Sequence, residues 1–407
     1  MSVDRVHDLE RIRQDTPLCS RYIYLDAAAA APPPRPVVEV MTTYLQHLAE
    51  WGPYLPRFRA ETYDRVEAIR RKAAEFIGAT PEEIAFTRNG TEGINLVAEG
   101  LPWREGDEIV LLDIEFHSNY VPWLRLAKEK GVRLQVIQTP QDGLVTPDMV
   151  IAAVNPRTRL VTLTHVSNAL GTVQPAAEIG AALKKEHPQV LYLINASQSL
   201  GLLPLQVQRL HCDFLTAPGR KWLRGPEGSG LLYVRREWIE SLRPPLVGWG
   251  GTEWFASEDE FRYAATAKRF QAGLPDIPAI LGLGAALEYA QQLDIQWIAN
   301  RVRHLTDYGY ELLQQISGVT VLGPRLSRDR IGMIPFIVQG LAPRRVVAAL
   351  EEEGVIVEAG SFMAHVALAK YGVQEVVRIS PHYYNTEADL EQAARLLADL
   401  IRKEERR

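Results

Sequence analysis

Lys221 stands in a turn-forming stretch, "TAPGRKWLRGPEGSG" (216–230), between Arg220 and Trp222. Lysine usually lies on solvated surfaces, because burying its ammonium group is costly. A neighbouring cation and an aromatic wall should lower the pKa of Lys221, and a lower pKa makes the amine a better nucleophile. Taken alone, the stretch is also compatible with a loop lysine that has no chemistry.

Polar clusters follow five strand-like segments of the sequence. The first, "NGTEG" (89–93), offers Asn89 as a helix N-cap and leaves the backbone N–H groups of Gly90 and Thr91 free for a phosphate. The others are "EFHSN" (115–119), "HVSNALGT" (165–172), "NASQS" (195–199) and "APGRKW" (217–222). Ligands of an open α/β sheet bind beyond the carboxyl ends of its strands, so these clusters should surround one crevice. A phosphate cradle with a reactive lysine suits pyridoxal 5′-phosphate held as a Schiff base.

The elements that position these clusters alternate between short apolar runs and helical patterns. This alternation predicts an α/β domain around a mainly parallel sheet. The expected strands are 83–88, 107–116, 133–139, 159–167, 190–197, 212–217 and 230–235. Long helices with a few short strands follow residue 255 and predict a smaller α+β domain. We therefore expect a large cofactor-binding domain at 22–255 and a small domain at 256–407, joined by the N-terminal segment 1–21, with a linker near "GWGGTEWF" (248–255).

Composition narrows the class of protein. The 407 residues are 46% hydrophobic and 23% charged, with a net charge of -5 and a pI of about 6.1. There is no basic excess that would indicate a nucleic acid or an anionic membrane as a partner. The charged N-terminus lacks a signal sequence and no run of about 20 apolar residues exists, so we expect a cytoplasmic protein. Cys19 and Cys212 are too few for a disulfide framework or a zinc cluster, and we expect no metal.

The motifs together resemble a known family. From "YIYLDAAA" near residue 22 to "RISPHYYNTEADL" near residue 390, the chain is similar to the class V, aminotransferase-like branch of the fold-type I pyridoxal phosphate enzymes. That branch includes cysteine desulfurases, C–S lyases, isopenicillin N epimerases and hercynylcysteine sulfoxide lyases. The resemblance implies the fold-type I architecture, a homodimer and an amino-acid substrate.

The resemblance also implies roles for individual residues. Lys221 would form the Schiff base, and Arg378 would grip the substrate carboxylate, for which its planar fork is suited. Gly90 and Thr91 match the phosphate-binding turn, and Phe116 matches the position that stacks on the cofactor ring, with His117 beside it as the fallback. The full set expected to bind the cofactor is Gly90, Thr91, Phe116, His117, Asn168, Asn195, Gln198, Arg220 and Lys221.

Several positions depart from the family pattern at the cofactor. Asn195 stands where an aspartate usually pairs with the pyridine nitrogen, and a neutral amide should give a weaker electron sink. Phe116 replaces the usual histidine and cannot transfer protons, which leaves Lys221 as the main acid/base. Pro218 and Leu274 replace hydroxyl residues at the phosphate, so we expect Arg220 to compensate there.

One departure concerns sulfur. Met363 in "EAGSFMAHVAL" (358–368) stands about where cysteine desulfurases carry their nucleophilic cysteine, and a thioether cannot form a persulfide by thiolate attack. We therefore expect a lyase that cleaves a β-substituent, through a C–S bond, without a persulfide-forming cysteine. The alternatives are an epimerase, racemase or aminotransferase of class V, a cysteine desulfurase-like enzyme, and a protein that binds the cofactor without turnover.

Overall fold

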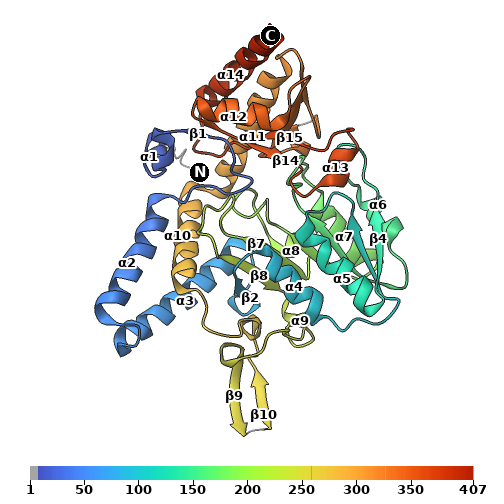
Figure 1. Cartoon of the computed structure of the whole chain (residues 1–407). Coiled ribbons are helices and arrows are strands. Elements are labelled where there is room, and N and C mark those ends of the chain that lie inside the picture. The colour runs from blue at the N-terminus through green and yellow to red at the C-terminus, as the bar shows by residue number, and fades with distance from the viewer. Residues whose placement is uncertain (1–7, 258, 326, 407) are drawn as a thin grey trace, which may run out of the picture.

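A seven-stranded sheet forms the centre of the larger part of the chain (Figure 1). The structure is a computed structural model that describes residues 8–257, 259–325 and 327–406. In spatial order the strands are β2 (Ile84–Thr87), β8 (Gly230–Val234), β7 (Phe214–Pro218), β6 (Leu191–Asn195), β5 (Thr158–Thr164), β3 (Glu108–Leu112) and β4 (Arg133–Ile137). All of them are parallel except β8, which is antiparallel to both of its neighbours. The predicted, mainly parallel sheet is confirmed.

The sheet forms because its central strands are nearly continuous apolar runs that can be buried on both faces. Every residue of β3, β6, β7 and β8 is buried. β4 is the exception, since Arg133 and Gln135 are exposed, as expected of a strand at the sheet edge.

β3 is shorter than the strand predicted at 107–116, because the chain leaves the sheet in a turn after Leu112. The buried carboxylate of Glu115 accepts hydrogen bonds from the backbone N–H of Thr164 at 2.7 Å and from Asn119 Nδ2 at 2.8 Å. Burial raises the pKa of Glu115 to about 8. The polar contacts of this carboxyl group hold the loop that carries Phe116.

Helices cover the faces of the large sheet. They are α2 (Arg35–Trp51), α3 (Pro56–Ile77), α4 (Gly90–Gly100), α5 (Val121–Lys130), α6 (Pro147–Ala153), α7 (Ala176–Glu186), α8 (Val207–Leu210), α9 (Arg236–Ile239) and α10 (Ile277–Leu293). α10 packs against α2 and α3, and its Leu283 and Leu287 belong to the same core as Leu215 of β7. The division at residues 255 and 256 stays a prediction, yet α10 lies beyond it and packs with the large sheet.

A hairpin stands where we expected a linker. β9 (Thr252–Ser257) and β10 (Glu260–Tyr263) pair in antiparallel fashion and project from the lower end of the molecule in Figure 1. The chain then returns through the 3-10 turn at Ala267–Phe270 to α10.

The smaller part contains an antiparallel sheet of four strands. Their spatial order is β11 (Val319–Val321), β12 (Ile334–Val338), β15 (Val376–Ile379) and β14 (Glu358–Gly360). The helices around it are α11 (Ile295–Gln314), α12 (Pro343–Glu352), α13 (His365–Ala369) and α14 (Glu387–Glu405). Thr386 and Asp389 form a capping box at the start of α14.

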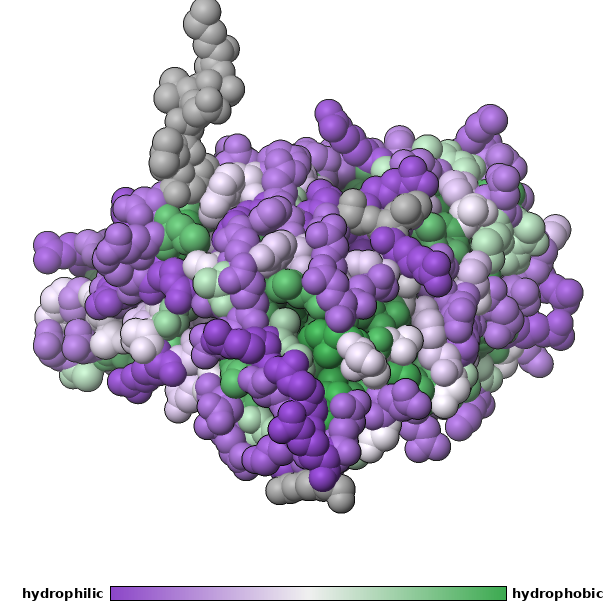
Figure 2. Space-filling view, turned by 90° about the horizontal axis from the view of Figure 1, so that it is seen from above, coloured by the Kyte–Doolittle hydropathy of each residue, from purple (hydrophilic) through white to green (hydrophobic). Residues whose placement is uncertain are grey.

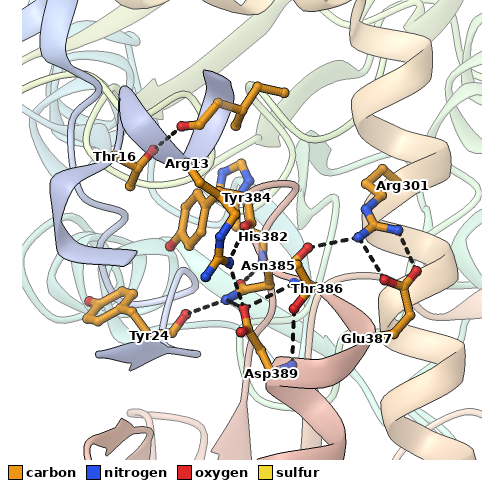
Figure 3. Close-up of polar contacts among 11 residues, drawn as sticks. Arg13, Thr16, Tyr24, Arg301, His382, Tyr384, Asn385, Thr386, Glu387 and Asp389 are labelled. Carbon is orange, nitrogen blue, oxygen red and sulfur yellow. Dashed lines mark hydrogen bonds and ion pairs between the residues drawn. The ribbon is translucent and has the colours of Figure 1, made fainter. Parts of the chain in front are cut away.

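The N-terminal segment is attached to this smaller part. β1 (Ile23–Tyr24) pairs in parallel with β13 (Val355–Ile356), just after the short helix α1 (Leu9–Gln14). Arg13 donates to the carbonyl of Tyr384 and to Asp389 at 3.0 Å each, and Asn385 Nδ2 donates to the carbonyl of Tyr24 (Figure 3). These bonds fix the loop that follows β15. Residues 1–7, at the start of the charged N-terminus, lie outside the described residues.

The surface seen from above is largely hydrophilic, with hydrophobic residues visible in a hollow near its middle (Figure 2). Within residues 8–406, apart from 258 and 326, every helix is too short or too polar to cross a membrane. The cytoplasmic location stays a prediction.

Candidate functional site

The five polar clusters follow β2, β3, β5, β6 and β7, as predicted. These strands run parallel to one another, so their carboxyl ends meet at one edge of the sheet. Lys221 follows β7 and Phe116 follows β3, with β6 and β5 between them in the sheet, and Lys221 Nζ lies 5.9 Å from the centre of the Phe116 ring. The fold therefore places the reactive lysine among the clusters that the sequence singled out.

Lys221 lies at the head of a tight turn after β7. The N–H of Arg224 donates to the Lys221 carbonyl at 2.9 Å, and the N–H of Gly225 donates to the Gly219 carbonyl at 2.8 Å. Burial, together with the cationic groups of Arg220 and Arg378, lowers the pKa of Lys221 to about 7 against the opposing effect of nearby carboxylates. The predicted direction of this shift agrees with the structure. An amine with this pKa is substantially unprotonated at neutral pH.

Trp222 anchors the lysine turn in the protein interior. Its ring is 1% exposed, and its Nε1 donates to Gln198 Oε1 at 2.6 Å. Gln198 Nε2 in turn donates to the carbonyl of Ala28 at 3.0 Å. Both polar groups of Gln198 are thus engaged within the protein, where they support the lysine turn. Its contact with the cofactor stays a prediction.

Arg224 is a functional candidate that sequence reasoning missed. It has a φ of 62° and is completely buried. Its guanidinium donates to the carbonyl of Pro32 at 2.8 Å, to the hydroxyl of Tyr383 at 3.0 Å and to that of Thr16 at 2.6 Å. Arg224 therefore joins the lysine turn to the N-terminal segment and to the loop after β15. The only signal in the sequence was an arginine directly before the "GP" of the turn.

The N-terminus of α4 has the features of a phosphate cradle. Asn89 caps the helix, since its Oδ1 accepts from the N–H of Glu92 at 2.9 Å. A Cβ atom on Gly90 would meet the hydroxyl of Ser197 at 2.9 Å, so only glycine leaves this approach open. The hydroxyl of Thr91 is 2.8 Å from that of Ser118.

Two of these hydroxyl groups add to the predicted cradle. Ser118 and Ser197 bring hydroxyl groups beside the free N–H groups at the start of α4. The O–H of Ser197 donates to Asn195 Oδ1, so the hydroxyl pair of Ser118 and Thr91 is the O–H donor that suits a phosphate. Sequence reasoning did not assign them, because serine is common in loops and nothing in the spacing ties residue 118 to residue 91.

Phe116, and not His117, faces the lysine. His117 is exposed and its ring stacks on that of His365, with centroids 5.5 Å apart. His365 begins α13, so this pair joins the loop after β3 to the smaller part of the chain. Phe116 thus remains the candidate for stacking on the cofactor ring.

Asn195 ends β6 and is 2% exposed. Its Oδ1 accepts from the backbone N–H of Ser197 at 3.1 Å and from the Ser197 hydroxyl at 2.6 Å. A backbone N–H can only donate, so the oxygen of the amide must face Ser197 and the NH₂ group must point the other way. Asn195 can therefore offer a hydrogen-bond donor, and no negative charge, to a ring nitrogen.

Arg378 of β15 is buried and surrounded by acceptors. Nη1 donates to the carbonyl of Asn168 at 2.8 Å, and Nη2 donates to Asp26 at 3.0 Å and to Glu358 at 2.7 Å. The guanidinium lies 3.9 Å from the centre of the Phe362 ring. Asn168 Nδ2 donates to the Phe362 carbonyl, so the structure joins Asn168 to the arginine and to this loop.

Arg220 is half-buried beside the N-terminal segment. Its Nη1 donates to the carbonyl of Ala29, and its own carbonyl accepts from the N–H of Ala31 at 3.0 Å. Its predicted contact with a phosphate stays a prediction.

The thiols lie away from this arrangement. Cys212 is fully buried in the core, and burial raises its thiol pKa far above the ordinary value. Cys19 is half-buried near Arg13 and Arg224, and burial likewise raises its pKa. Met363 is half-exposed in the loop next to Arg378, where it and Phe362 both have positive φ, 54° and 51°. Among the described residues, no group of three or more histidine, cysteine or acidic side chains could hold a metal ion.

Comparison with known proteins finds similar proteins over nearly the whole length of the chain. The family model for aminotransferase class-V matches residues 23–393. A probable cysteine desulfurase of Methanothermobacter thermautotrophicus is 36% identical over 398 residues, which cover 96% of this chain and 98% of that protein. The apo structure of a cysteine desulfurase from Thermococcus onnurineus is 34% identical, covers 99% of this chain and 100% of its own, and superposes with a TM-score of 0.92.

A cystine C–S lyase, C-DES, is also similar. Its complex with the reaction product cysteine persulfide is 26% identical to this chain, with a TM-score of 0.86 and coverage of 95% of this chain and 99% of that one. A C-DES mutant with glycine covalently linked to the PLP cofactor has a TM-score of 0.87 at the same identity and coverage.

Proposed function

The chain belongs to the aminotransferase class-V family, and from that premise we propose that it is a lyase that breaks the C–S bond of a sulfur-containing amino acid without storing the sulfur on a cysteine of its own. Membership confirms the family, the fold and the cofactor that the motifs predicted. The chain is a pyridoxal 5′-phosphate-dependent enzyme of this family.

The residues at the sheet edge fit this cofactor. The opening at Gly90, which a Cβ would obstruct, would accommodate a phosphate at the N-terminus of α4, with the hydroxyl pair of Thr91 and Ser118 as a donor. Phe116 would cover the ring and the NH₂ group of Asn195 would face the ring nitrogen. Lys221 would attach the aldehyde, for which its low pKa prepares it.

When bound, the cofactor withdraws electrons from the α-carbon of an amino acid attached through its amino group. The residues of this chain supply binding and proton transfer. Arg378 holds the α-carboxylate, and Lys221 takes the α-proton at Nζ, which a pKa of about 7 permits at neutral pH. Phe116 carries no titratable group, so it cannot compete for that proton.

The proposed reaction balances without an oxidant. The α-proton moves to Lys221, the C–S bond breaks, and the sulfur leaves with the bonding electrons and takes up a proton. Hydrolysis of the remaining fragment gives pyruvate and ammonia. From cysteine the third product is hydrogen sulfide, and from cystine it is cysteine persulfide.

The observation that supports release over storage is Met363. It occupies the exposed loop beside Arg378, where a thiol would have to stand, and neither Cys19 nor Cys212 lies in that loop. Both thiols also have raised pKa values, so little thiolate forms near neutral pH.

A second candidate is cysteine desulfurase activity, which the names of the similar proteins favour. In this reaction sulfur is transferred and alanine is the organic product. For this chain, sulfur would have to pass to a thiol that is not in the described site.

Product analysis separates the two. The holoenzyme is incubated with L-cysteine or L-cystine, and pyruvate, ammonia and alanine are measured, with Lys221→Ala as the inactive control. We expect pyruvate and ammonia in equal amounts, and an unmodified mass for the protein chain. Alanine together with a sulfur adduct on Cys19 or Cys212 would establish the desulfurase instead.

We also propose that the protein is a homodimer. Large apolar side chains are exposed on α2, directly after it, and between residues 246 and 274: Val38, Leu45, Trp51, Tyr54, Leu55, Leu246, Val247, Trp249 and Leu274. Tyr54, Trp249 and Leu274 line a cavity of about 420 Å³, and Leu274 and Leu246 line one of about 580 Å³ beside Thr87. Apolar surface of this extent favours a partner, and a second copy is the partner that the family resemblance implies. Light scattering at decreasing concentration tests it, and a persistent monomer would contradict it.

A further inference from the structure

The guanidinium of Arg378 already holds two carboxylates of the protein. Glu358 and Arg378 lie directly opposite each other on β14 and β15. An isolated β-bridge between Asp26 and Ser380 brings Asp26 close to the same arginine. Both carboxylates accept from the single nitrogen Nη2, at 2.7 Å and 3.0 Å. Nε is buried and has no hydrogen-bond partner.

This occupancy conflicts with the task of binding a substrate carboxylate. A guanidinium binds a carboxylate best through two parallel N–H bonds from neighbouring nitrogens. Each pair of neighbouring nitrogens of the Arg378 guanidinium that includes Nη2 is blocked as long as Asp26 and Glu358 both accept hydrogen bonds from Nη2. A third carboxylate on the same cation is also opposed by the charges of the first two.

Glu358 is the carboxylate that can leave. Its side chain is 42% exposed, whereas that of Asp26 is 13% exposed. Asp26 is further held by the backbone pairing of its neighbours, since the N–H of Ala27 donates to the Ser380 carbonyl. Burial raises the pKa of Asp26 to about 6, with Glu358 contributing, so the negative charges are already crowded here.

A displaced Glu358 side chain would stay close to Arg378, because the pairing of β14 with β15 holds its backbone opposite that residue. The groups that act on the charge of Lys221 are the cations Arg220 and Arg378 and the anions Glu358 and Asp26. Binding of an α-carboxylate to Arg378 leaves this side of the site with an excess of negative charge. A positive group on the far end of the substrate would remove that excess.

We propose that Glu358 selects the substrate: it competes with the α-carboxylate for Arg378 and, when displaced, pairs with a cationic group on the sulfur substituent. The substrate class is then an S-substituted cysteine whose leaving group carries an ammonium or similar cation. The substrate class rests on the proposed lyase function. The preference of Glu358 for a cationic substituent can be measured by binding alone.

The binding experiment uses amino acids of matched length that contain no sulfur. L-lysine, L-norleucine and L-2-aminoadipate carry a positive, neutral or negative end group, and their dissociation constants are measured on the holoenzyme from the change in its visible absorption. We expect lysine to bind about fivefold more tightly than norleucine, and aminoadipate to bind most weakly, because half-exposed ion pairs contribute modestly.

The Glu358→Gln variant tests the residue. It should bind norleucine more tightly than the native enzyme does, since the competitor for Arg378 is gone, and should lose the preference for lysine. Glu375→Gln is the matched control, because Glu375 pairs with Arg344 at the surface and should leave both values unchanged. Lysine binding no better than norleucine in the native enzyme, or an unchanged preference in Glu358→Gln, would overturn the proposal.

Turnover separates this proposal from the proposed function. Pyruvate release is compared for S-(2-aminoethyl)-, S-propyl- and S-carboxymethyl-L-cysteine. The charge preference in binding together with pyruvate from the aminoethyl compound supports both proposals. A charge preference in binding without any pyruvate release supports the role of Glu358 and contradicts the proposed lyase function. Pyruvate from all three compounds at equal kcat/KM keeps the lyase and removes the role of Glu358.

Discussion

Lys221 Nζ lies 5.9 Å from the centre of the Phe116 ring, although the two residues stand 105 positions apart in the chain. The aromatic ring helps to exclude water from the amine while offering it no proton acceptor. Arg220 and Arg378 add positive charge on the same amine. Burial and these two cations favour the uncharged form of Lys221, and this leads to a prediction about pH.

Cofactor capture by the apoprotein should follow the titration of Lys221. The unprotonated amine attacks the aldehyde, and its fraction is half at a pH of about 7 and falls about tenfold per pH unit below that. We expect the rate of covalent cofactor uptake to rise with pH up to about 7 and then to level off. The rate is followed by visible absorption after rapid mixing, with Lys221→Ala as the control. A rate that still rises steeply at alkaline pH, where ordinary lysines titrate, would contradict a lowered pKa.

Asn195→Asp should strengthen the electron sink. The amide of Asn195 is oriented by Ser197 so that it offers a donor to the ring nitrogen, which matches an unprotonated ring. A carboxylate at this position would instead hold the nitrogen protonated. We expect transamination to increase relative to elimination, measured as pyridoxamine phosphate formed per pyruvate released.

The control for this change is Ser197→Ala, which keeps the amide but removes one of the two bonds that orient it. It should weaken the hold on the ring without adding charge, so the product ratio should stay near that of the native enzyme. An equal product ratio in Asn195→Asp and the native enzyme would mean that another group faces the ring nitrogen.

Gly93→Ala should destabilise the cradle helix. Gly93 lies on the buried side of α4, where a Cβ would overlap the hydroxyl of Thr216 in β7. Overpacking of this kind costs about 1–3 kcal/mol, and it would push the start of α4 away from the sheet edge. We expect a lower free energy of unfolding and weaker cofactor binding, measured by denaturant titration and by equilibrium dialysis.

Gly273→Ala is the matched control for this substitution, because a Cβ there would meet no atom within 4 Å. Its effect on stability should stay within about 0.5 kcal/mol. If Gly93→Ala were as stable as Gly273→Ala, the close packing of α4 on β7 would not be a constraint.

The sheet and the lysine turn were predictable because their signals are local. Apolar runs such as that of β6 indicate buried strands, and the end of each run marks the end of its strand. The clusters could be assigned to one edge because parallel strands end together. Asn89 was recognised as a cap for the same reason, since a cap is read from three or four consecutive residues.

The missed residues depend on contacts between distant segments. Glu358 matters because it is paired with Arg378 across two strands, and only the register of β14 on β15 reveals that pairing. Arg224 matters because Thr16 and Tyr383 meet it from two ends of the chain. Nothing in the local pattern at these positions distinguishes them from surface residues.

Met363→Cys tests whether the loop beside Arg378 can support sulfur transfer. Met363 is half-exposed, and the preceding residue, Phe362, contacts Arg378 directly, so a thiol at position 363 would stand at the mouth of the site. We expect this variant, given L-cysteine, to acquire a sulfur adduct at position 363 and to divert part of its product from pyruvate to alanine. Val366→Cys is the matched control, since Val366 is equally exposed but lies on α13, three residues further along the chain. Mass spectrometry of the intact and digested chain locates the adduct. Equal labelling at both positions would indicate a persulfide in solution as the sulfur donor, and no adduct at position 363 would mean that the loop does not bring this residue to the substrate.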